Sequence, residues 1–184
     1  MTGTWTVDSE TGDFDYERAT GTFVGFRITE ELSTVGSTEA VGRTGDVTGS
    51  ITIDGTTLTE ATFEADVTTI TTNSSRRDSK VQEALETEEH PTATFVLSEP
   101  VDLGEGVAEG GSASVTATGD LTIHGVTRSV AVPLQAQLVG ETVVVVGSLD
   151  LVFSDDEVEV PTSPIVVSVE DHGSMELQLL LTRS

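Results

Sequence analysis

Histidine is the side chain in this sequence best suited to proton transfer or metal binding near neutral pH. The chain has three, His90, His124 and His172, and each lies at a turn or loop signal. A metal site within one segment needs further ligands at short spacing, and only the acidic run 86–89 before His90 offers any. We therefore interpret all three as solvated turn residues and predict no metal site, with convergence of the three in the folded chain left open.

Other catalytic or ion-binding patterns are absent or weak. The chain has no cysteine, which excludes disulfides, thiolate zinc sites and a thiol nucleophile. It contains no G-x-S-x-G sequence and no glycine-rich phosphate loop. The run "DSETGDFDYE" (8–17) fails the EF-hand spacing, which leaves weak calcium binding as the alternative to a solvated loop. Carboxylates are too numerous for "SDDEVEVP" (154–161) to indicate a glycosidase, so we predict no catalytic residues and no enzyme activity.

The charge of the chain restricts its partners. The 32 acidic residues oppose 8 basic ones, which gives a formal net charge of −24. Such a surface repels phosphate backbones and anionic lipid headgroups, so we predict no nucleic-acid partner. Aromatic residues make up 4% of the chain, too few for a base-stacking platform. No segment approaches the roughly 18 apolar residues of a membrane span, so we predict none in this chain.

Alternation of apolar and polar residues dominates the chain and predicts β-strands. In "GSITIDGTTLTEATFEADVTTI" (49–70), alternation leads into Asp54-Gly55 and resumes after it, as in an antiparallel hairpin. In "GDLTIHGVTRSVAVPLQAQL" (119–138), His124-Gly125 takes the same place between two alternating runs. Similar runs recur at 20–32, 92–101, 143–156 and 174–184.

One segment has a different period. In "NSSRRDSKVQEALETEEHP" (73–91), Val81, Ala84 and Leu85 recur at helical spacing, and Pro91 prevents continuation. We predict one short helix at about residues 75–88. The whole chain, 1–184, is predicted to form a single all-β domain of about eight strands. We favour a closed antiparallel up-and-down barrel over a sandwich, because consecutive strands are expected to be neighbours.

In each predicted strand, every second residue is apolar, and these residues are predicted to point into the barrel. Alternation cannot tell whether they fill the interior as a dry core or line a tunnel for a ligand, and both alternatives stay open. The predicted inward residues are Val24, Phe26, Ile28, Ile51, Ile53, Phe63, Val67, Phe95, Leu121, Ile123, Val132, Leu134, Leu149, Leu151 and Phe153. Since none of them is titratable, they also argue against an enzyme with its site in the barrel.

Several spaced motifs resemble one known family. "GDLTIHGVTRSVAVPL" (119–134) is similar to the signature hairpin of the YceI-like, polyisoprenoid-binding proteins, which carry G-x-L-T-[IL]-x-G-x-T-[KR]. "GTWTVD" (3–8) matches their opening W-x-[IV]-D, and Arg77-Asp78 resembles their R-D before the helix. "LETEEHPTATFVLSEPV" (85–101) is similar to their segment with P-x-A-x-F. The resemblance covers nearly the whole chain and looks strongest to actinobacterial members.

The resemblance implies an extended lipocalin-like barrel whose apolar interior binds, carries or stores an isoprenoid-type lipid. The ligand would be a polyprenyl or quinone tail or another fatty chain, and the residues named above as inward-pointing would line its tunnel. No cofactor is implied. The alternative is a ligand-free structural or interaction domain with a packed core.

The chain also departs from the family pattern. Many members have an H-S motif soon after the opening strand, whereas this chain has no histidine before His90, so headgroup contacts from that region are not expected. The resemblance implies an extracytoplasmic domain, secreted or tethered, whose leader or anchor is not part of this chain; a cytoplasmic location is the alternative. A homodimer stays open.

Overall fold

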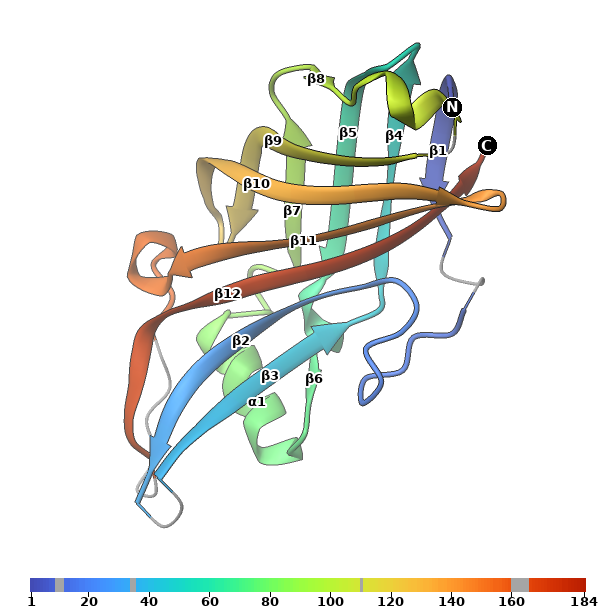
Figure 1. Ribbon diagram of the computed structural model, residues 1–184. Coiled ribbons are helices and arrows are strands. Elements are labelled where there is room, and N and C mark those ends of the chain that lie inside the picture. The colour runs from blue at the N-terminus through green and yellow to red at the C-terminus, as the bar shows by residue number, and fades with distance from the viewer. Residues whose placement is uncertain (9–11, 34–35, 110, 160–165) are drawn as a thin grey trace.

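The computed structural model describes residues 1–8, 12–33, 36–109, 111–159 and 166–184. Eight antiparallel strands form a closed barrel, because β1 pairs with β4 on one side and with β12 on the other (Figure 1). This confirms the predicted barrel. Its strands are β1 (Gly3–Val7), β4 (Val47–Asp54), β5 (Thr57–Asp66), β7 (Thr92–Leu97), β9 (Ser112–Ile123), β10 (Val126–Val139), β11 (Thr142–Val152) and β12 (Val166–Arg183).

A branch of the sheet was not predicted. β2 (Phe23–Leu32) pairs with β12 and with β3 (Gly36–Thr44), which in turn pairs with the short β6 (Thr71–Thr72). β1 pairs with only three residues of β12, at the C-terminal end of β12. The rest of that edge of β12 is therefore free to pair with β2. Consecutive strands are therefore neighbours around most of the barrel, but β1 is followed in sequence by the branch. In Figure 1 the branch extends away from the end that holds both termini.

The predicted helix is present and shorter than expected. α1 spans Ser75–Ala84, and Glu86 then adopts a left-handed backbone with φ 46°. Because the helix leaves no residue fully buried, it lies as a cover beside the branch rather than inside the core (Figure 1). The remaining elements are β8 (Val101–Asp102) and the one-turn helices η1 (Val67–Thr69), η2 (Glu105–Glu109) and η3 (Phe153–Asp156).

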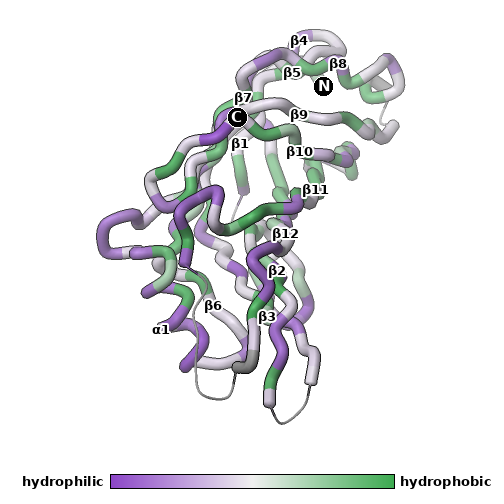
Figure 2. Tube along the Cα trace, turned by 90° about the vertical axis from the view of Figure 1, so that its left-hand side faces the viewer, coloured by the Kyte–Doolittle hydropathy of each residue, from purple (hydrophilic) through white to green (hydrophobic). Residues whose placement is uncertain are grey.

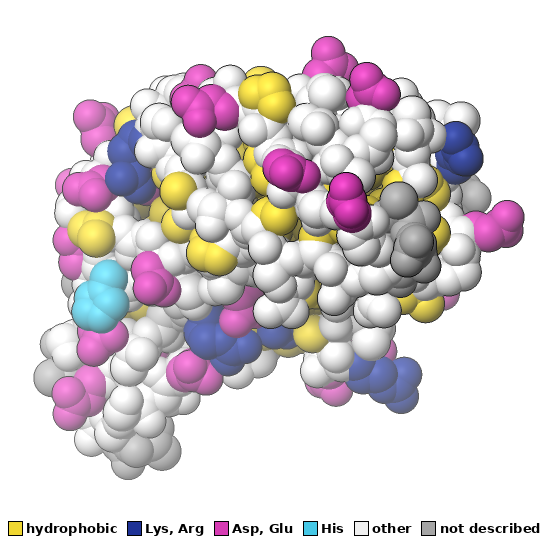
Figure 3. All heavy atoms as spheres, turned by 45° about the horizontal axis from the view of Figure 1, so that its top comes forward, with side chains coloured by type: hydrophobic (Ala, Val, Ile, Leu, Met, Phe, Trp, Pro, Cys, Tyr) yellow, Lys and Arg dark blue, Asp and Glu magenta, His cyan; other side chains and the backbone are white. Residues whose placement is uncertain are grey.

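The solid hydrophobic core occupies the closed end of the barrel. Trp5, Ile53, Val143 and Leu181 are each at most 4% exposed and belong to one apolar cluster. Hydrophobic and hydrophilic residues alternate along the strands, as the period of two requires (Figure 2). Acidic side chains are spread over the face seen in Figure 3, in keeping with 32 acidic against 8 basic residues in the chain.

Candidate functional site

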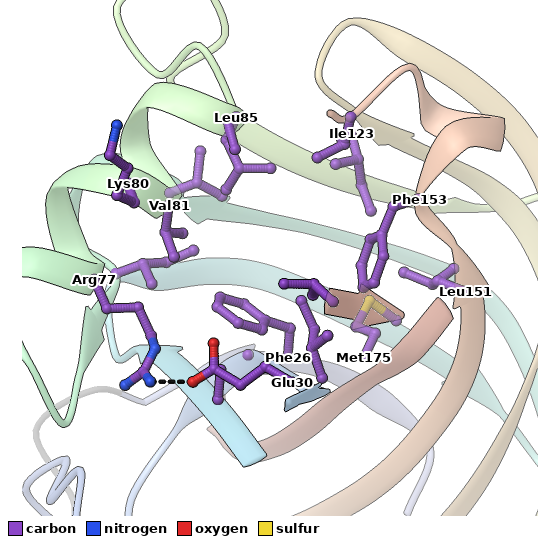
Figure 4. A pocket seen from close by; sticks show the side chains of 18 of the residues that line it. Phe26, Glu30, Arg77, Lys80, Val81, Leu85, Ile123, Leu151, Phe153 and Met175 are labelled. Carbon is purple, nitrogen blue, oxygen red and sulfur yellow. Dashed lines mark hydrogen bonds and ion pairs between the residues drawn. The ribbon is translucent and has the colours of Figure 1, made fainter. Parts of the chain in front are cut away.

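The opposite end of the barrel is hollow. A cavity of about 880 Å³ lies between the barrel strands, the β2–β3 branch and α1. Aliphatic and aromatic side chains from these elements point into it, and charged groups gather near α1 (Figure 4). A smaller hollow of about 100 Å³ adjoins it and shares the lining residues Val24, Ala93 and Met175.

The structure places the fifteen predicted inward residues in three groups. Lining the large cavity are Val24, Phe26, Ile28, Val67, Ile123, Leu151 and Phe153. Lining the small hollow, together with Val24, are Phe63, Phe95, Leu121, Val132 and Leu134. Lining neither are Ile51 and Ile53, which belong to the closed core, and the half-buried Leu149. Contact of any of them with a lipid stays a prediction.

Sequence reasoning missed the part of the lining that α1 supplies. Val81, Ala84 and Leu85 project into the cavity from the helix and its C-terminal cap. Their helical spacing identified an apolar face, but the sequence did not indicate what that face covers. Met175 on β12 and Ile70 after η1 were missed as well.

The cavity lining also includes titratable groups, none of which is among the fifteen predicted residues. Glu30, Arg76, Arg77, Lys80 and Asp156 all border the cavity. They were missed because β2 continues beyond the barrel into the branch, and because α1 brings its own charges to the rim. Three of the chain's eight basic residues therefore lie at one opening of a strongly acidic protein.

Most of these charges are paired. Arg77 forms an ion pair with Glu30 (Figure 4) and also donates a hydrogen bond to the side-chain oxygen of Asn73. The Glu30 side chain is 9% exposed, so its partner offsets the cost of burying the carboxylate. Lys80 contacts Glu83 on the exposed helix surface. Arg76 is exposed, and among the described residues it has no ion-pair or hydrogen-bond partner.

A buried ion pair holds η3 in place at the rim of the large cavity, that is, at its charged border. Arg128 on β10 donates from Nε to Asp156 Oδ1 at 2.8 Å and from Nη2 to Oδ2 at 2.7 Å. The Asp156 side chain is only 3% exposed. The hydrogen bond from Arg128 to Asp156 raises the pKa of the guanidinium above its ordinary value, so Arg128 stays positively charged.

Two of the three histidines come together in the folded chain, an arrangement that the sequence left open. The hairpin turn at His124-Gly125 is confirmed, since Ile123 pairs with Val126 and both turn residues have positive φ. The His124 side chain, however, is only 12% exposed, so it is not a solvated turn residue. Its ring lies edge-on to that of His90 with centroids 5.0 Å apart. His172 lies elsewhere, beside Glu170.

Two further expectations concern acidic runs. Part of "DSETGDFDYE" (8–17) lies outside the described residues, so its weak calcium binding stays untested. The described portion of "SDDEVEVP" is largely the η3 turn, where Asp155 and Asp156 both contact Arg128.

Within the described part of the chain, no helix has the length and apolar character needed to cross a membrane.

Solved structures with this fold include three bacterial proteins. A polyisoprenoid binding domain from Saccharophagus degradans superposes with a TM-score of 0.69 at 15% identity, over 100% of both chains. BcnA from Burkholderia cenocepacia gives 0.65 at 21% identity, over 91% of this chain and 99% of that one. A YceI protein from Campylobacter jejuni gives 0.63 at 17% identity, over 78% and 84%.

Sequence comparison identifies the family. A UPF0312 protein of Shewanella sp. (strain ANA-3) is 32% identical over 118 residues, which are 62% of this chain and 57% of that protein. The chain thus matches little more than half the length of this relative. These relatives do not test the expected similarity to actinobacterial members, which stays a prediction. The model of the YceI-like domain matches residues 5–180, and the chain therefore belongs to the YceI-like family.

Proposed function

We propose that this protein binds a long apolar lipid tail of the isoprenoid type in the large cavity and carries or stores it. The observation that carries the proposal is the cavity itself, about 880 Å³ in size and lined mainly by aliphatic and aromatic side chains. This volume lies toward the upper end of small-molecule sites, which span about 300–1,000 Å³. A neighbour with the same fold is described as a polyisoprenoid binding domain, which supports an isoprenoid tail as the occupant.

The physical basis of such binding is removal of apolar surface from water. Each 40 Å² of tail surface covered contributes about 1 kcal/mol, from which the cost of ordering a flexible chain is subtracted. The alternative of a fully packed barrel is not favoured, because side chains fill only the closed end. Among the described residues that line the cavity, the charged groups are mostly engaged in ion pairs rather than free to act on a substrate. A binding role is therefore favoured over catalysis.

The polar end of the ligand is proposed to lie beside α1. Arg76 and Lys80 border the cavity there and are both exposed, so an acidic or strongly polar headgroup could approach them without losing its hydration. We further propose an extracytoplasmic location for this activity, as for the exported proteins that the family resemblance implies.

Extraction of the purified protein tests the proposal. Protein purified without detergent from its native source is expected to release a prenyl or other long-chain lipid into organic solvent, in near-stoichiometric amount by mass spectrometry. The delipidated protein is then titrated with a dansyl-labelled geranylgeranyl alcohol. Clean extracts together with no saturable binding of this probe would remove the proposal.

The headgroup position leads to a separate prediction. Arg76→Gln is expected to weaken binding of a long-chain fatty acid about threefold, and to leave the alcohol of the same chain unchanged, because an exposed charge contributes under about 1 kcal/mol. Competition against the dansyl probe measures both ligands. Arg18→Gln, at an 80% exposed site away from the cavity, is the matched control. Equal effects of Arg76→Gln on acid and alcohol would contradict a head beside α1.

A further inference from the structure

Glu86, His90 and His124 form a compact group of metal-binding side chains outside the lipid cavity. Their ligand atoms all lie within 4.8 Å of one another. Glu86 and His90 come from the turn that follows α1, and His124 comes from the β9–β10 turn. We propose that these three residues bind a divalent transition-metal ion, with Zn²⁺ as the best match, and that the ion joins the two turns.

The backbone places the two ligands of the first turn on the same side. The His90 N–H donates to the Glu86 carbonyl at 2.8 Å, which closes a single turn between residues four apart. The ligand atoms of both side chains accordingly lie within 4.8 Å of each other. On the second turn, the αL conformation of His124 aims its ring toward the same point, and the His90 ring lies against Gly125.

The hydrogen bond made by His124 leaves its other nitrogen ready for a metal. Nδ1 lies 3.3 Å from the Asp156 carbonyl oxygen. A carbonyl can only accept, so Nδ1 is the donor and carries the proton. A metal ion can then bind at Nε2, and this arrangement, with the other ring nitrogen bonded to a backbone carbonyl, is typical of metal-binding histidines.

The surroundings of His124 Nε2 favour the binding of a cation. This atom is buried and has no hydrogen-bond partner among the described residues. Glu86 Oε2 lies 3.2 Å away, without hydrogen-bond geometry. A lone pair and a carboxylate oxygen both accept, so two acceptors at this distance need a positive species that both can bind. A proton shared between His124 and Glu86 would satisfy these two side chains only. A metal ion would bind the adjacent His90 as well.

The donor set indicates the class of metal. Two imidazoles with one carboxylate are a ligand set that zinc sites use, whereas Ca²⁺ and Mg²⁺ prefer oxygen ligands throughout. A tetrahedral zinc site brings its ligand atoms to about 3.4 Å apart. The ligand atoms here lie within 4.8 Å of one another, so the side chains must move only modestly to reach that distance. Glu86 can supply much of this movement because its side chain is 58% exposed.

The site also borders the lipid cavity without forming part of it. Leu85 precedes Glu86 and Ile123 precedes His124, and both line the cavity on the side where α1 faces the barrel. A bound ion would therefore hold the helix turn against the barrel at this point of the rim (Figure 4). Metal binding itself does not depend on what occupies the cavity.

Calorimetric titration of the metal-free full chain with ZnCl₂, in the presence of excess Ca²⁺, tests the proposal. We expect one saturable site whose affinity falls in Glu86→Gln, His90→Gln and His124→Asn by at least the roughly 10- to 100-fold that changes behind the direct ligands cause. Glu86→Gln is the decisive variant, because an exposed side chain can be changed without unfolding the protein. His124→Asn keeps a residue type that tolerates positive φ.

Matched controls separate this site from general attraction of cations to an acidic surface. His172→Gln removes a histidine that is paired with Glu170 elsewhere, and Glu88→Gln removes one exposed charge near the cluster. Both are expected to bind zinc as the parent does. The Co²⁺-loaded parent should show visible absorption bands that His124→Asn lacks. Unchanged zinc affinity in Glu86→Gln, equal losses in the controls, or full suppression by Ca²⁺ would each overturn the proposal.

Discussion

Replacing Ala84 by Trp is expected to weaken binding of a geranylgeranyl probe about tenfold. Ala84 is half-buried on α1 and lines the large cavity, so an indole at this position occupies space that the tail needs. Displacing about 60 Å² of tail contact costs about 1.5 kcal/mol at 25 cal/mol per Å², which corresponds to roughly one order of magnitude in Kd. Fluorescence titration of the delipidated variant measures the change.

The control for this substitution is Ser75→Trp. Ser75 lies on the same helix and is exposed, but it does not line the cavity. It adds the same indole where no tail is expected, so its affinity should match that of the parent. A Kd for Ala84→Trp within a factor of two of both would show that the tail binds elsewhere. Circular dichroism of both variants establishes that α1 is retained.

Arg128→Met is expected to lower the free energy of unfolding by about 3 kcal/mol. The substitution leaves the Asp156 carboxylate, 3% exposed, without the guanidinium that now bonds to both its oxygens. Removing one partner of a buried pair is costly because the remaining charge stays desolvated. Urea denaturation with an unchanged m-value measures the loss.

A double substitution distinguishes loss of the pair from loss of packing. Arg128→Met combined with Asp156→Asn removes both charges, so the double variant should recover part of the stability that Arg128→Met loses. The control is Arg18→Met, which removes an exposed arginine whose ion pair with Asp15 spans 3.5 Å and should change stability by less than about 0.5 kcal/mol. A loss below about 1 kcal/mol in Arg128→Met, or no recovery in the double variant, would contradict this account of the rim.

Alternation in the sequence was sufficient to predict most strands because each has one buried face, and the expectation that consecutive strands are neighbours then favoured a barrel. The hairpin centred on His124-Gly125 illustrates this, since alternating runs and a turn pair define both strands and their register. The β2–β3 branch could not be predicted in the same way. Alternation indicates that a strand has two faces, but it does not indicate which edge of which strand it joins.

The site was predictable only in part for a related reason. Alternation with a period of two residues separates inward-pointing from outward-pointing side chains. It carries no information on how far along the barrel axis a side chain lies. Ile53 and Phe26 therefore looked equivalent, although one lies in the closed core and the other lines the cavity. The approach of His90 to His124 depends on how the turn after α1 meets the β9–β10 turn, which is a tertiary contact that no local spacing encodes.

Photolabelling tests the central claim, tail binding in the large cavity, most directly. A geranylgeranyl probe that carries a terminal diazirine is bound to the delipidated protein and irradiated, and the labelled peptides are mapped by mass spectrometry after cleavage at glutamate. We predict labels on cavity residues such as Phe26, Ile123 and Phe153, and suppression by unlabelled geranylgeraniol. Labels confined to the exposed valines Val96, Val139, Val146 and Val152 would contradict the account, because the tail would then lie on the outer surface of the barrel.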